Sequence, residues 1–409
     1  VNYEEKGQDY PIGYVRWTEN RNMKSFIDLL DSGQLNISNL ISHEFSLMNS
    51  FKAYNMILSR NENFSAIVIN YDIEKKIDNK IVFNDKRKIS ETISLGVVGA
   101  GSFAQSFLLP NFKNKCDFVG LVTGSGNTAV HVGKKYNFAY LSNDSMELFN
   151  DEEINAILIA TRHNLHSNLV IKSIEKNKHV FTEKPLAINI KELEKIKNIF
   201  IKNNYNKNLM IGFNRRFAPA IKDLVKNMPS NGQKSILIRV NNSQNDKDHW
   251  TNDLDIGGGR IVSDACHFID LSIFIAQSEV ISVSAETMSN PDELNDSVCI
   301  NLKFQNGSIA SINYFSNGNE NLGKEYIEIY NGSTVYIVDD FMSLNIINKR
   351  SQKIKYSSLD KGHLNCVNEF LESIKNATGS PIAFSEIYMS SLVTLLVNKS
   401  LFENRKIFL

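Results

Sequence analysis

The fold is decided by the stretch Ile93-Ser94-Leu95-Gly96-Val97-Val98-Gly99-Ala100-Gly101-Ser102-Phe103-Ala104. Its apolar first half predicts a buried strand, and its glycine-rich second half predicts a tight turn that opens a helix. Gly99 permits the turn, Gly101 lets the backbone approach a pyrophosphate, and Ala104 replaces a third glycine where the helix meets the strand. Unpaired N–H groups at a helix N-terminus favour an anion. We therefore expect a dinucleotide cofactor to contact Gly99, Gly101, Ser102, Phe103 and Ala104.

Strand patterns alternate with helical patterns downstream of this turn. Apolar, strand-like runs occupy Phe118–Val122, Ile154–Ala160, His179–Phe181 and Leu209–Phe213. Strands that alternate with amphipathic helices indicate parallel βαβ units. The sequence therefore predicts an α/β fold with a doubly wound parallel sheet of the Rossmann type.

Beyond residue 213 the strands are longer and are joined by hairpin signals. Asn306-Gly307 and Asn331-Gly332 each separate two alternating apolar runs, and Asn-Gly in that setting is the strongest short-range signal for a hairpin. We expect an α/β domain with a large, mostly antiparallel open sheet. Three helices should back this sheet, at Ile261–Ala276, Leu364–Ile374 and Ile387–Phe402.

The chain of 409 residues divides into four expected segments. Residues 1–72 contain two short helices and a strand, which is too little for a core of their own. Residues 73–92 are polar and charged, as in a linker. Residues 93–213 form the nucleotide-binding domain, and residues 214–409 form the second domain.

The composition excludes several classes of protein. Lys and Arg total 45, as do Asp and Glu, so no basic excess predicts binding to nucleic acid or to a membrane surface. No apolar run approaches the roughly 20 residues that a transmembrane helix needs. The four cysteines are scattered without a Cys-x-x-Cys pair, which argues against a structural zinc site and a disulfide framework. We expect a cytoplasmic protein.

A lysine fixed in front of a proline follows one of the expected strands, in Glu183-Lys184-Pro185-Leu186. Pro185 restricts the backbone before it, and ligands of open α/β sheets bind beyond the carboxyl ends of the strands. The ammonium of Lys184 could then stabilise an alkoxide-like oxygen as hydride leaves or arrives. We expect Lys184 to be catalytic, and both Glu183 and Lys184 to contact the cofactor.

A second glycine-rich loop, Gly257-Gly258-Gly259, leads into a helix. Asp264, His267 and Asp270 are spaced by three residues and should share one helix face. A carboxylate beside an imidazole fixes its tautomer and raises its basicity, so His267, helped by Asp264, could accept a proton. Zinc binding through Cys266 and His267 is not expected, because no further ligands have suitable spacing.

Other polar residues could contact the cofactor or the substrate. The second strand is not followed by an acidic residue that could bind the ribose of the cofactor. Thr123 and Ser125 occupy this position and are expected to contact the cofactor. The sequence therefore does not decide between NAD and NADP. The residues expected to line the nicotinamide crevice are Thr161 and His166. The residues expected to contact the substrate are Arg215, Arg216, His249, Trp250 and His267.

Together these motifs resemble the Gfo/Idh/MocA family of oxidoreductases, from about Ser94 to the C-terminus. The resemblance is carried by Gly99–Ala104, Ala160-Thr161 with His166, Glu183–Ala187, and Gly257–Gly259 with His267. It implies that Lys184 and His267 act in the oxidation or reduction of a hydroxyl on a sugar, nucleotide sugar or cyclitol, with NAD or NADP. It also implies a homo-oligomer formed through the open sheet. The family usually carries an aspartate where this chain has Ser263.

Residues 1–72 resemble the C-terminal tail of a zinc-type, medium-chain alcohol dehydrogenase. The resemblance rests on residues 26–33, 41–47 and 53–54. The combination is similar to two-domain oxidoreductases of bacterial surface-polysaccharide synthesis, which would make this chain the C-terminal part of a longer protein.

The sequence therefore favours a nicotinamide-dependent oxidoreductase that acts on a sugar or nucleotide-sugar hydroxyl. Two alternatives remain open. One is a hydrolase or lyase of the same fold that uses NAD transiently to cleave a glycosidic bond. The other is a module that binds the cofactor without turnover.

Overall fold

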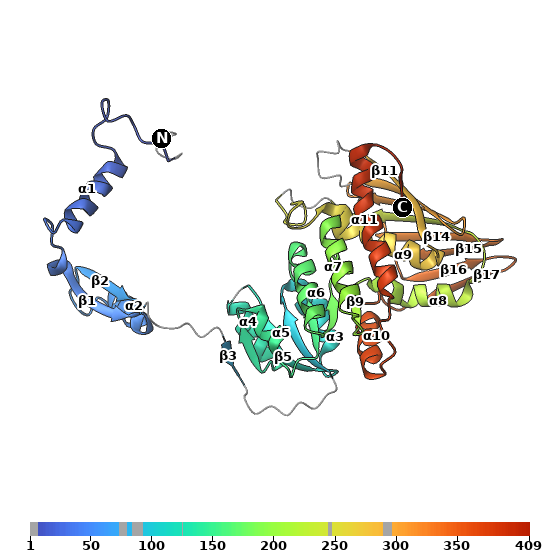
Figure 1. Ribbon diagram of the computed structural model, residues 1–409, viewed down its shortest axis with the longest axis horizontal. Coiled ribbons are helices and arrows are strands. Elements are labelled where there is room, and N and C mark those ends of the chain that lie inside the picture. Colours follow the sequence, from blue (N-terminus) through green and yellow to red (C-terminus); the bar gives the residue numbers. More distant parts are fainter. Residues whose placement is uncertain (1–6, 73–79, 84–92, 125, 244–247, 289–296) are drawn as a thin grey trace. The chain divides into compact units, whose positions relative to one another are not determined.

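The structure is a computed structural model that describes residues 7–72, 80–83, 93–124, 126–243, 248–288 and 297–409 (Figure 1). The chain separates into two compact units, Val1–Asp78 and Asn79–Leu409. The second unit contains two large sheets, each with its own hydrophobic core. We call the parts built on these sheets the Rossmann domain and the second domain.

The first unit contains a small βαβ element. Its strands β1 (Ile41–Ser46) and β2 (Ala66–Asn70) pair in parallel, and helix α2 (Ser50–Ser59) connects them. Helix α1 (Glu19–Asp31) precedes them. Ala53 is the only buried apolar residue in the described part of this unit. The unit therefore has almost no core of its own, and β1 was not among the elements that the sequence predicted.

The first sheet of the second unit is the predicted Rossmann sheet. Its strands lie in the order β3-β6-β5-β4-β7-β8-β9, and each described neighbour pair is parallel except the edge pair of β3 with β6. The strands are β3 (Lys80–Val82), β4 (Ser94–Val98), β5 (Asp117–Val122), β6 (Tyr140–Ser142), β7 (Ala156–Ile159), β8 (His179–Thr182) and β9 (Leu209–Ile211). The helices between them are α3 (Leu109–Phe112), α4 (Gly126–Tyr136), α5 (Ser145–Asn150), α6 (His166–Glu175) and α7 (Ile190–Lys202). The strand order reverses at β4, which makes the sheet doubly wound.

A short strand lies inside the range that was expected to be a linker. β3 pairs antiparallel with β6, from Lys80 opposite Ser142 to Val82 opposite Tyr140. The Lys80 ammonium also lies 3.8 Å from the centroid of the Tyr140 ring. The prediction of a linker is therefore wrong for these residues, because a three-residue strand has too short a pattern to recognise. The rest of the expected linker, residues 73–79 and 84–92, lies outside the described residues.

The second sheet is large, open and mostly antiparallel, as predicted. Its order is β17-β16-β15-β14-β10-β13-β12-β11-β18, and each described pair is antiparallel except β10 with β13. The strands are β10 (Lys234–Asn241), β11 (Val280–Thr287), β12 (Val298–Phe304), β13 (Ile309–Phe315), β14 (Glu325–Asn331), β15 (Thr334–Asp339), β16 (Ser343–Ile347), β17 (Ser351–Lys355) and β18 (Ile407–Phe408). Gly307 and Gly332 join β12 to β13 and β14 to β15 with φ of 88° and 61°, as Asn-Gly hairpins require.

Helices cover one face of the second sheet. The covering helices are α8 (Pro219–Asn227), α9 (Cys266–Ala276) and α11 (Phe384–Glu403). Buried residues alternate along β12 and β13, the period expected of strands with one covered face. The opposite face presents exposed apolar side chains such as Leu237 and Ile309.

Helix α10 (His363–Lys375) does not back the second sheet, contrary to the sequence-based expectation. It packs beside α3 in the Rossmann core (Figure 1), and the ring of Phe370 lies 5.5 Å from that of Phe181. An amphipathic pattern predicts that a helix has a buried face but not which sheet covers it. The chain after residue 214 therefore contributes to both cores.

Helix α11 is the longest helix in the described part of the chain, with 20 residues. The charged residues Glu386, Lys399 and Glu403 interrupt its apolar sequence. Neither α11 nor any other described helix combines the length and the apolar character that spanning a bilayer requires.

Candidate active site

The turn after β4 brings the backbone close to β7. Gly99 has a φ of +95°, and a Cβ there would lie 2.3 Å from the carbonyl oxygen of Ala160. No side chain fits at that separation, so the turn requires glycine. The Gly99 N–H donates to Val122 at 2.7 Å, and the Ala160 N–H donates to Val98 at 2.8 Å. These bonds hold the carboxyl ends of β4, β5 and β7 together.

The next residues leave an open cradle at a helix N-terminus. A Cβ on Gly101 would meet no atom within 4 Å, and residues 101–103 are exposed. Ala104 is buried, as expected at the contact of helix and strand. The helix begins at Ser102, contains a π-helical turn at Ala104–Leu108, and continues past Pro110 as α3. Open space in front of helix N–H groups fits the pyrophosphate of a dinucleotide.

The second strand of the Rossmann sheet ends without a carboxylate. β5 stops at Val122, Thr123 is half-buried and Gly124 is exposed. A Cβ on Gly124 would meet no atom within 4 Å, so this end of the sheet is open. Ser125, which was expected to contact the cofactor, lies outside the described residues.

The loop after β7 is bonded to the glycine-rich loop of the second domain. Nδ1 of His163 lies 2.7 Å from the carbonyl oxygen of Gly257. The N–H of Asn164 donates to the carbonyl oxygen of Ile256 at 3.1 Å. These bonds fix one side of the junction between the Rossmann domain and the second domain.

His166 positions the loops around it and does not reach the surface of the cleft. Its side chain is fully buried, at 0% exposure. Its ring nitrogens lie 2.8 Å from the carbonyl oxygen of Pro185 and 3.2 Å from that of Thr161. Burial lowers the pKa of His166. The prediction that His166 contacts the nicotinamide is wrong, because a fully buried side chain presents no surface to a ligand. Thr161 is half-buried and stays a candidate.

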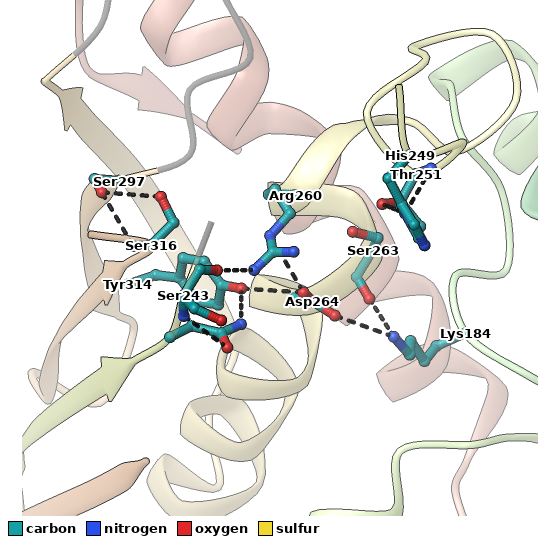
Figure 2. Close-up of polar contacts among 11 residues, drawn as sticks. Lys184, Ser243, His249, Thr251, Arg260, Ser263, Asp264, Ser297, Tyr314 and Ser316 are labelled. Atoms are coloured by element: carbon teal, nitrogen blue, oxygen red, sulfur yellow. Dashed lines mark hydrogen bonds and ion pairs between the residues drawn. The ribbon is translucent and has the colours of Figure 1, made fainter. Parts of the chain in front are cut away.

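Lys184 extends from the end of β8 into the second domain. Its peptide bond to Pro185 is cis. Its ammonium donates to the carbonyl oxygen of Ser263 and lies 3.6 Å from a carboxylate oxygen of Asp264 (Figure 2). The Lys184 side chain is 17% exposed. A lysine of the Rossmann domain is thus held by the backbone and a carboxylate of the second domain.

Asp264 binds two cations and a hydroxyl group. Besides its contact with Lys184, its carboxylate accepts from the Tyr314 hydroxyl at 3.0 Å and lies 3.5 Å from Nε of Arg260 (Figure 2). Burial works against the charge of this carboxylate, but Lys184 and Arg260 outweigh burial and lower the pKa of Asp264. Asp264 is therefore ionised at neutral pH.

The predicted pairing of Asp264 with His267 is wrong. A spacing of three residues puts two side chains on one face only in an α-helix. Here Ile261–Ala265 form a π-helical turn before α9 begins, and the Asp264 carboxylate contacts Lys184, Arg260 and Tyr314 instead of His267. Asp270 does not replace it, since its carboxylate binds Arg216.

The imidazole of His267 is buried and lines the cleft. Its Nδ1 makes no hydrogen bond within the part of the chain that the structure describes. Burial lowers the pKa of His267 well below its ordinary value, and Arg215 and Lys184 lower it further. The ring is therefore neutral at neutral pH. A neutral imidazole in the same cleft as an ammonium can accept the proton of a bound hydroxyl. Because Nδ1 is fully buried, the hydroxyl would reach the ring at Nε2.

Lys184 and His267 line one cleft of 410 Å³. The residues singled out in the sequence that the cleft brings together are Phe103, Glu183, Lys184, Arg215, Asp264 and His267. Other lining residues, which the sequence analysis missed, are Phe107, Asn242, Tyr314, Lys324, Lys361 and His363. No motif marks this second group, because its members come from separate loops, strands and helices that only the fold brings together.

Three rings form an aromatic wall of the cleft: Phe103, Phe107 and His363. The ring of Phe107 lies 5.2 Å from that of Phe103 and 5.3 Å from that of His363. Both phenylalanines are exposed, at 43% and 47%. The wall joins the glycine-rich turn to the start of α10.

Glu183 is a buried carboxyl group on the wall of the cleft. A Cβ on Gly212 would lie 2.6 Å from Oε1 of Glu183, so glycine leaves room for the carboxyl group. Burial raises the pKa of Glu183 to about 7, although Lys184 opposes the shift. The group is therefore partly protonated at neutral pH.

The two arginines that follow β9 differ in role. Arg215 lines the cleft, and its guanidinium donates to both carboxylate oxygens of Glu325 at 2.7 and 2.8 Å. Arg216 is buried, donates to both oxygens of Asp270 at 2.7 and 2.6 Å, and also donates to Glu386. The prediction that Arg216 binds the substrate is wrong, because two carboxylates occupy its guanidinium away from this cleft.

His249 and Trp250 lie beside the loop after β7 and not among the residues that line the cleft. The Trp250 ring lies 4.7 Å from that of His163. Nδ1 of His249 lies 2.7 Å from the Thr251 hydroxyl (Figure 2). Their expected contact with the substrate stays a prediction.

Cysteine and histidine side chains were also considered as metal ligands. No group of His, Cys, Asp and Glu residues in the described ranges is arranged to hold a metal ion. Cys266 is buried and unpaired, and burial raises the pKa of its thiol to about 12. Its thiol is therefore protonated at neutral pH and a poor ligand.

A Rossmann nucleotide edge that faces a lysine and a neutral histidine across one cleft defines a dinucleotide-dependent oxidoreductase. Residues 93–213 match the oxidoreductase family with an NAD-binding Rossmann fold, and residues 234–331 match the GFO/IDH/MocA C-terminal domain. The chain belongs to the Gfo/Idh/MocA family of oxidoreductases, as its motifs predicted. The resemblance of residues 1–72 to an alcohol dehydrogenase tail stays a prediction.

Similar proteins include enzymes with named substrates. The chain is 25% identical over 283 residues to myo-inositol 2-dehydrogenase of Thermotoga maritima, a match that covers 64% of this chain and 82% of the relative. A levoglucosan dehydrogenase complex with NADH and levoglucosan superposes with a TM-score of 0.69 at 17% identity, covering 77% and 99% of the two chains. UDP-N-acetylglucosamine 3-dehydrogenase from Acidithiobacillus ferrooxidans superposes with a TM-score of 0.64 at 17% identity, covering 75% and 97%. At these identities the two structural matches show a shared fold.

Alanine substitutions in the turn should separate folding from cofactor binding. Gly99→Ala forces a Cβ against Ala160 and should destabilise the protein by about 1 to 3 kcal/mol, with weaker NADH binding. Gly101→Ala meets no neighbour and should leave the melting temperature unchanged, while its methyl group fills the cradle and weakens NADH binding about tenfold. Thermal unfolding and fluorescence titration with NADH measure the two effects. Wild-type NADH affinity in Gly101→Ala would show that the cradle is not the pyrophosphate site.

The carboxyl group of Glu183 should make stability depend on pH. Its pKa is raised from 4.5 to about 7 in the folded protein, so the folded state binds the proton more tightly than the unfolded state. The contribution of Glu183 to stability should fall as pH rises through this interval, by at most about 1.4 kcal/mol per pH unit. Buried histidines with a lowered pKa, such as His267 and His363, give the opposite slope. We therefore expect urea unfolding at a series of pH values to show the loss in the difference between wild type and Glu183→Gln.

The exposed Glu175 on α6 provides the control for this experiment. Glu175→Gln removes a carboxyl group that is in contact with water, so it should keep the pH dependence of the wild type. Parallel curves for wild type and Glu183→Gln would contradict the raised pKa of Glu183.

Proposed function

We propose that the protein transfers hydride between a nicotinamide cofactor and a hydroxyl or keto carbon of a sugar or nucleotide sugar. One observation carries the proposal: Lys184 of the Rossmann domain and His267 of the second domain line the same cleft. A cation and a neutral base supply the two functions that reversible alcohol oxidation requires of a protein. When bound, the nicotinamide would supply the hydride acceptor or donor.

Lys184 would bind and polarise the substrate oxygen. Its ammonium is oriented by the carbonyl oxygen of Ser263 and by Asp264, 3.6 Å away. An ammonium has three donors, so one can stay with Ser263 while another binds the oxygen. Its charge favours the negative oxygen that develops as the hydroxyl proton leaves.

His267 would accept the hydroxyl proton in oxidation and return it in reduction. The support is that the ring lines the cleft and is neutral, because burial lowers its pKa well below the ordinary value. Asp264 would act on Lys184, because its carboxylate lies beside the ammonium of Lys184 and not beside the imidazole of His267. This makes Asp264 a positioning residue in the proposed mechanism.

The cofactor would rest on the turn Gly99–Ala104, with Thr123 at the ribose end and Thr161 and Glu183 near the nicotinamide. The open space in front of Gly101 supports this placement, since a Cβ there would meet no atom within 4 Å. The carboxyl ends of β4, β5 and β7 converge at this edge, where ligands of open α/β sheets bind.

The substrate class is supported by the names of similar proteins. Those names specify myo-inositol, levoglucosan and UDP-N-acetylglucosamine, which are all compounds with a polyhydroxylated ring. A cytoplasmic role in bacterial surface-polysaccharide synthesis is proposed from the resemblance of residues 1–72 to an alcohol dehydrogenase tail.

We also propose a homo-oligomer that forms through the uncovered face of the second sheet. Leu237, Ile309 and Tyr330 line a hollow of 460 Å³ on this sheet, and all three are exposed. Burial of such apolar surface stabilises association. We expect analytical ultracentrifugation to show a dimer or larger species, and Leu237→Glu to dissociate it. A monomeric wild type would contradict the proposal.

Removal of either cleft residue should abolish most of the activity. We expect Lys184→Met and His267→Ala each to lower kcat by about 10²- to 10⁴-fold, because each group acts on the reacting oxygen or its proton. NADH production from NAD with a panel of cyclitols, sugars and nucleotide sugars measures the effect.

Matched controls are available on exposed surfaces of the Rossmann domain. Lys195→Met on α7 and His131→Ala on α4 remove exposed side chains of the same types and should retain wild-type turnover. Wild-type kcat in Lys184→Met or in His267→Ala would disprove the assigned role of that residue.

A further inference from the structure

The cleft carries more cations than the protein neutralises. Its cationic lining residues are Lys184, Arg215, Lys324 and Lys361. Asp264 lies 3.6 Å from the first of these, and Glu325 binds Arg215 at 2.7 Å and Lys361 at 2.6 Å. The Lys324 ammonium is different, because it forms no ion pair or hydrogen bond with any residue in the described ranges.

The other titratable groups of the cleft do not neutralise this charge. Burial lowers the pKa of His363 to about 4 and that of His267 well below its ordinary value, so both rings are neutral. Glu183 is only partly ionised at neutral pH, because burial raises its pKa to about 7. The cleft therefore keeps the positive charge of Lys324 without a partner.

Lys324 lines the cleft and is exposed. Burial and the nearby Lys361 lower the pKa of Lys324, while Asp264 and Glu325 act in the opposite direction. An anionic ligand at Lys324 would relieve the repulsion between the two lysines.

Lys324 is held at the cleft by a tightly hydrogen-bonded loop. The side-chain amide of Asn241, at the end of β10, donates to the carbonyl oxygens of Asn319 and Leu322 at 2.7 and 2.8 Å. The backbone N–H of Asn241 donates to the carbonyl oxygen of Lys324 at 2.8 Å. A fixed backbone reduces the entropy that is lost when the side chain binds a ligand.

Gly318 makes this loop possible. A Cβ there would lie 1.8 Å from Oδ1 of Asn241, so any other residue would displace the amide. The N–H of Asn319 donates to the same Oδ1 at 3.1 Å, and the N–H of Gly318 donates to Asn242 at 2.9 Å. Both ends of the Asn241 side chain therefore fix the loop that carries Lys324.

Lys324 belongs to the second domain and not to the turn that is expected to hold the pyrophosphate, although Phe103 of that turn lines the same cleft. The pyrophosphate is expected at Gly99–Ala104 on the Rossmann sheet. Lys324 precedes β14 of the second sheet and lines the cleft together with His267. Because Lys324 shares the cleft with both proposed reacting groups, Lys184 and His267, an anion at Lys324 is assigned to the substrate.

We propose that the substrate carries an anionic group, a carboxylate or a phosphoryl group, and that Lys324 binds it. The inference rests on the proposed function, since it names the substrate class of the same cleft. Lys324 would determine specificity by favouring a sugar acid or a phosphorylated sugar over the neutral sugar with the same ring. It would take no part in the hydride transfer itself.

Isothermal titration calorimetry of the full chain loaded with NADH tests the proposal. The probes are D-glucose as the neutral reference, D-glucuronate for the carboxylate and α-D-glucose 1-phosphate for the phosphoryl group. We expect at least one anion to bind about tenfold or more tightly than glucose, which corresponds to one charge-assisted hydrogen bond. Added salt should reduce the preference for the anions. The anion that binds more tightly shows whether the charged group of the substrate is a carboxylate or a phosphoryl group.

Substitutions assign the preference to one side chain. Lys324→Met keeps the length of the side chain without its charge and should bring the ratio of anion to glucose affinity close to one. Lys324→Arg should retain the preference. Lys353→Met, at an exposed position on β17 outside the cleft, is the matched control and should keep the wild-type ratio.

Two results would overturn the proposal: a wild type that binds neither anion more tightly than glucose, or a preference that survives in Lys324→Met. Failure of this proposal can be distinguished from failure of the proposed function. A chain that prefers the anions but transfers no hydride would contradict the proposed function, and it would still support Lys324 as the anion-binding residue.

Discussion

The site depends on one interaction across the two sheets, in which the ammonium of Lys184 bonds to the carbonyl oxygen of Ser263 beside Asp264. The end of β8 fixes the backbone of the lysine, and the π-helical turn Ile261–Ala265 before α9 holds its ammonium. The contact between His163 and Gly257 supports the same junction from the other side. These polar contacts join the Rossmann domain to the second domain.

Most of the fold could be predicted because it is specified by neighbours in the sequence. Alternating strands and helices after Gly99 predicted the Rossmann sheet, and the Asn-Gly pairs predicted the hairpins of the second sheet. The short strand Lys80–Val82 was missed because it depends on the free edge of β6. The placement of α10 was wrong because its apolar face, which includes Phe370, fits either sheet in principle.

The same distinction applies to the candidate site: residues in local motifs were predicted, and residues whose contacts depend on the fold were misassigned or missed. Lys184 and His267 lie in motifs that the sequence shows, and the fold brings both to one cleft. The role of Asp264 was wrong because an α-helical spacing was applied to a π-helical turn. Arg216 was misplaced because its partners come from distant helices. Lys324 was missed because its position depends on a loop that no local pattern describes.

The aromatic wall links two distant parts of the chain. Phe103 belongs to the turn on which a dinucleotide would rest, and its ring lies 5.2 Å from that of Phe107 and 6.1 Å from that of His363, the first residue of α10. Because these rings pack against one another, a smaller side chain at any of the three would remove contacts on both sides of the wall.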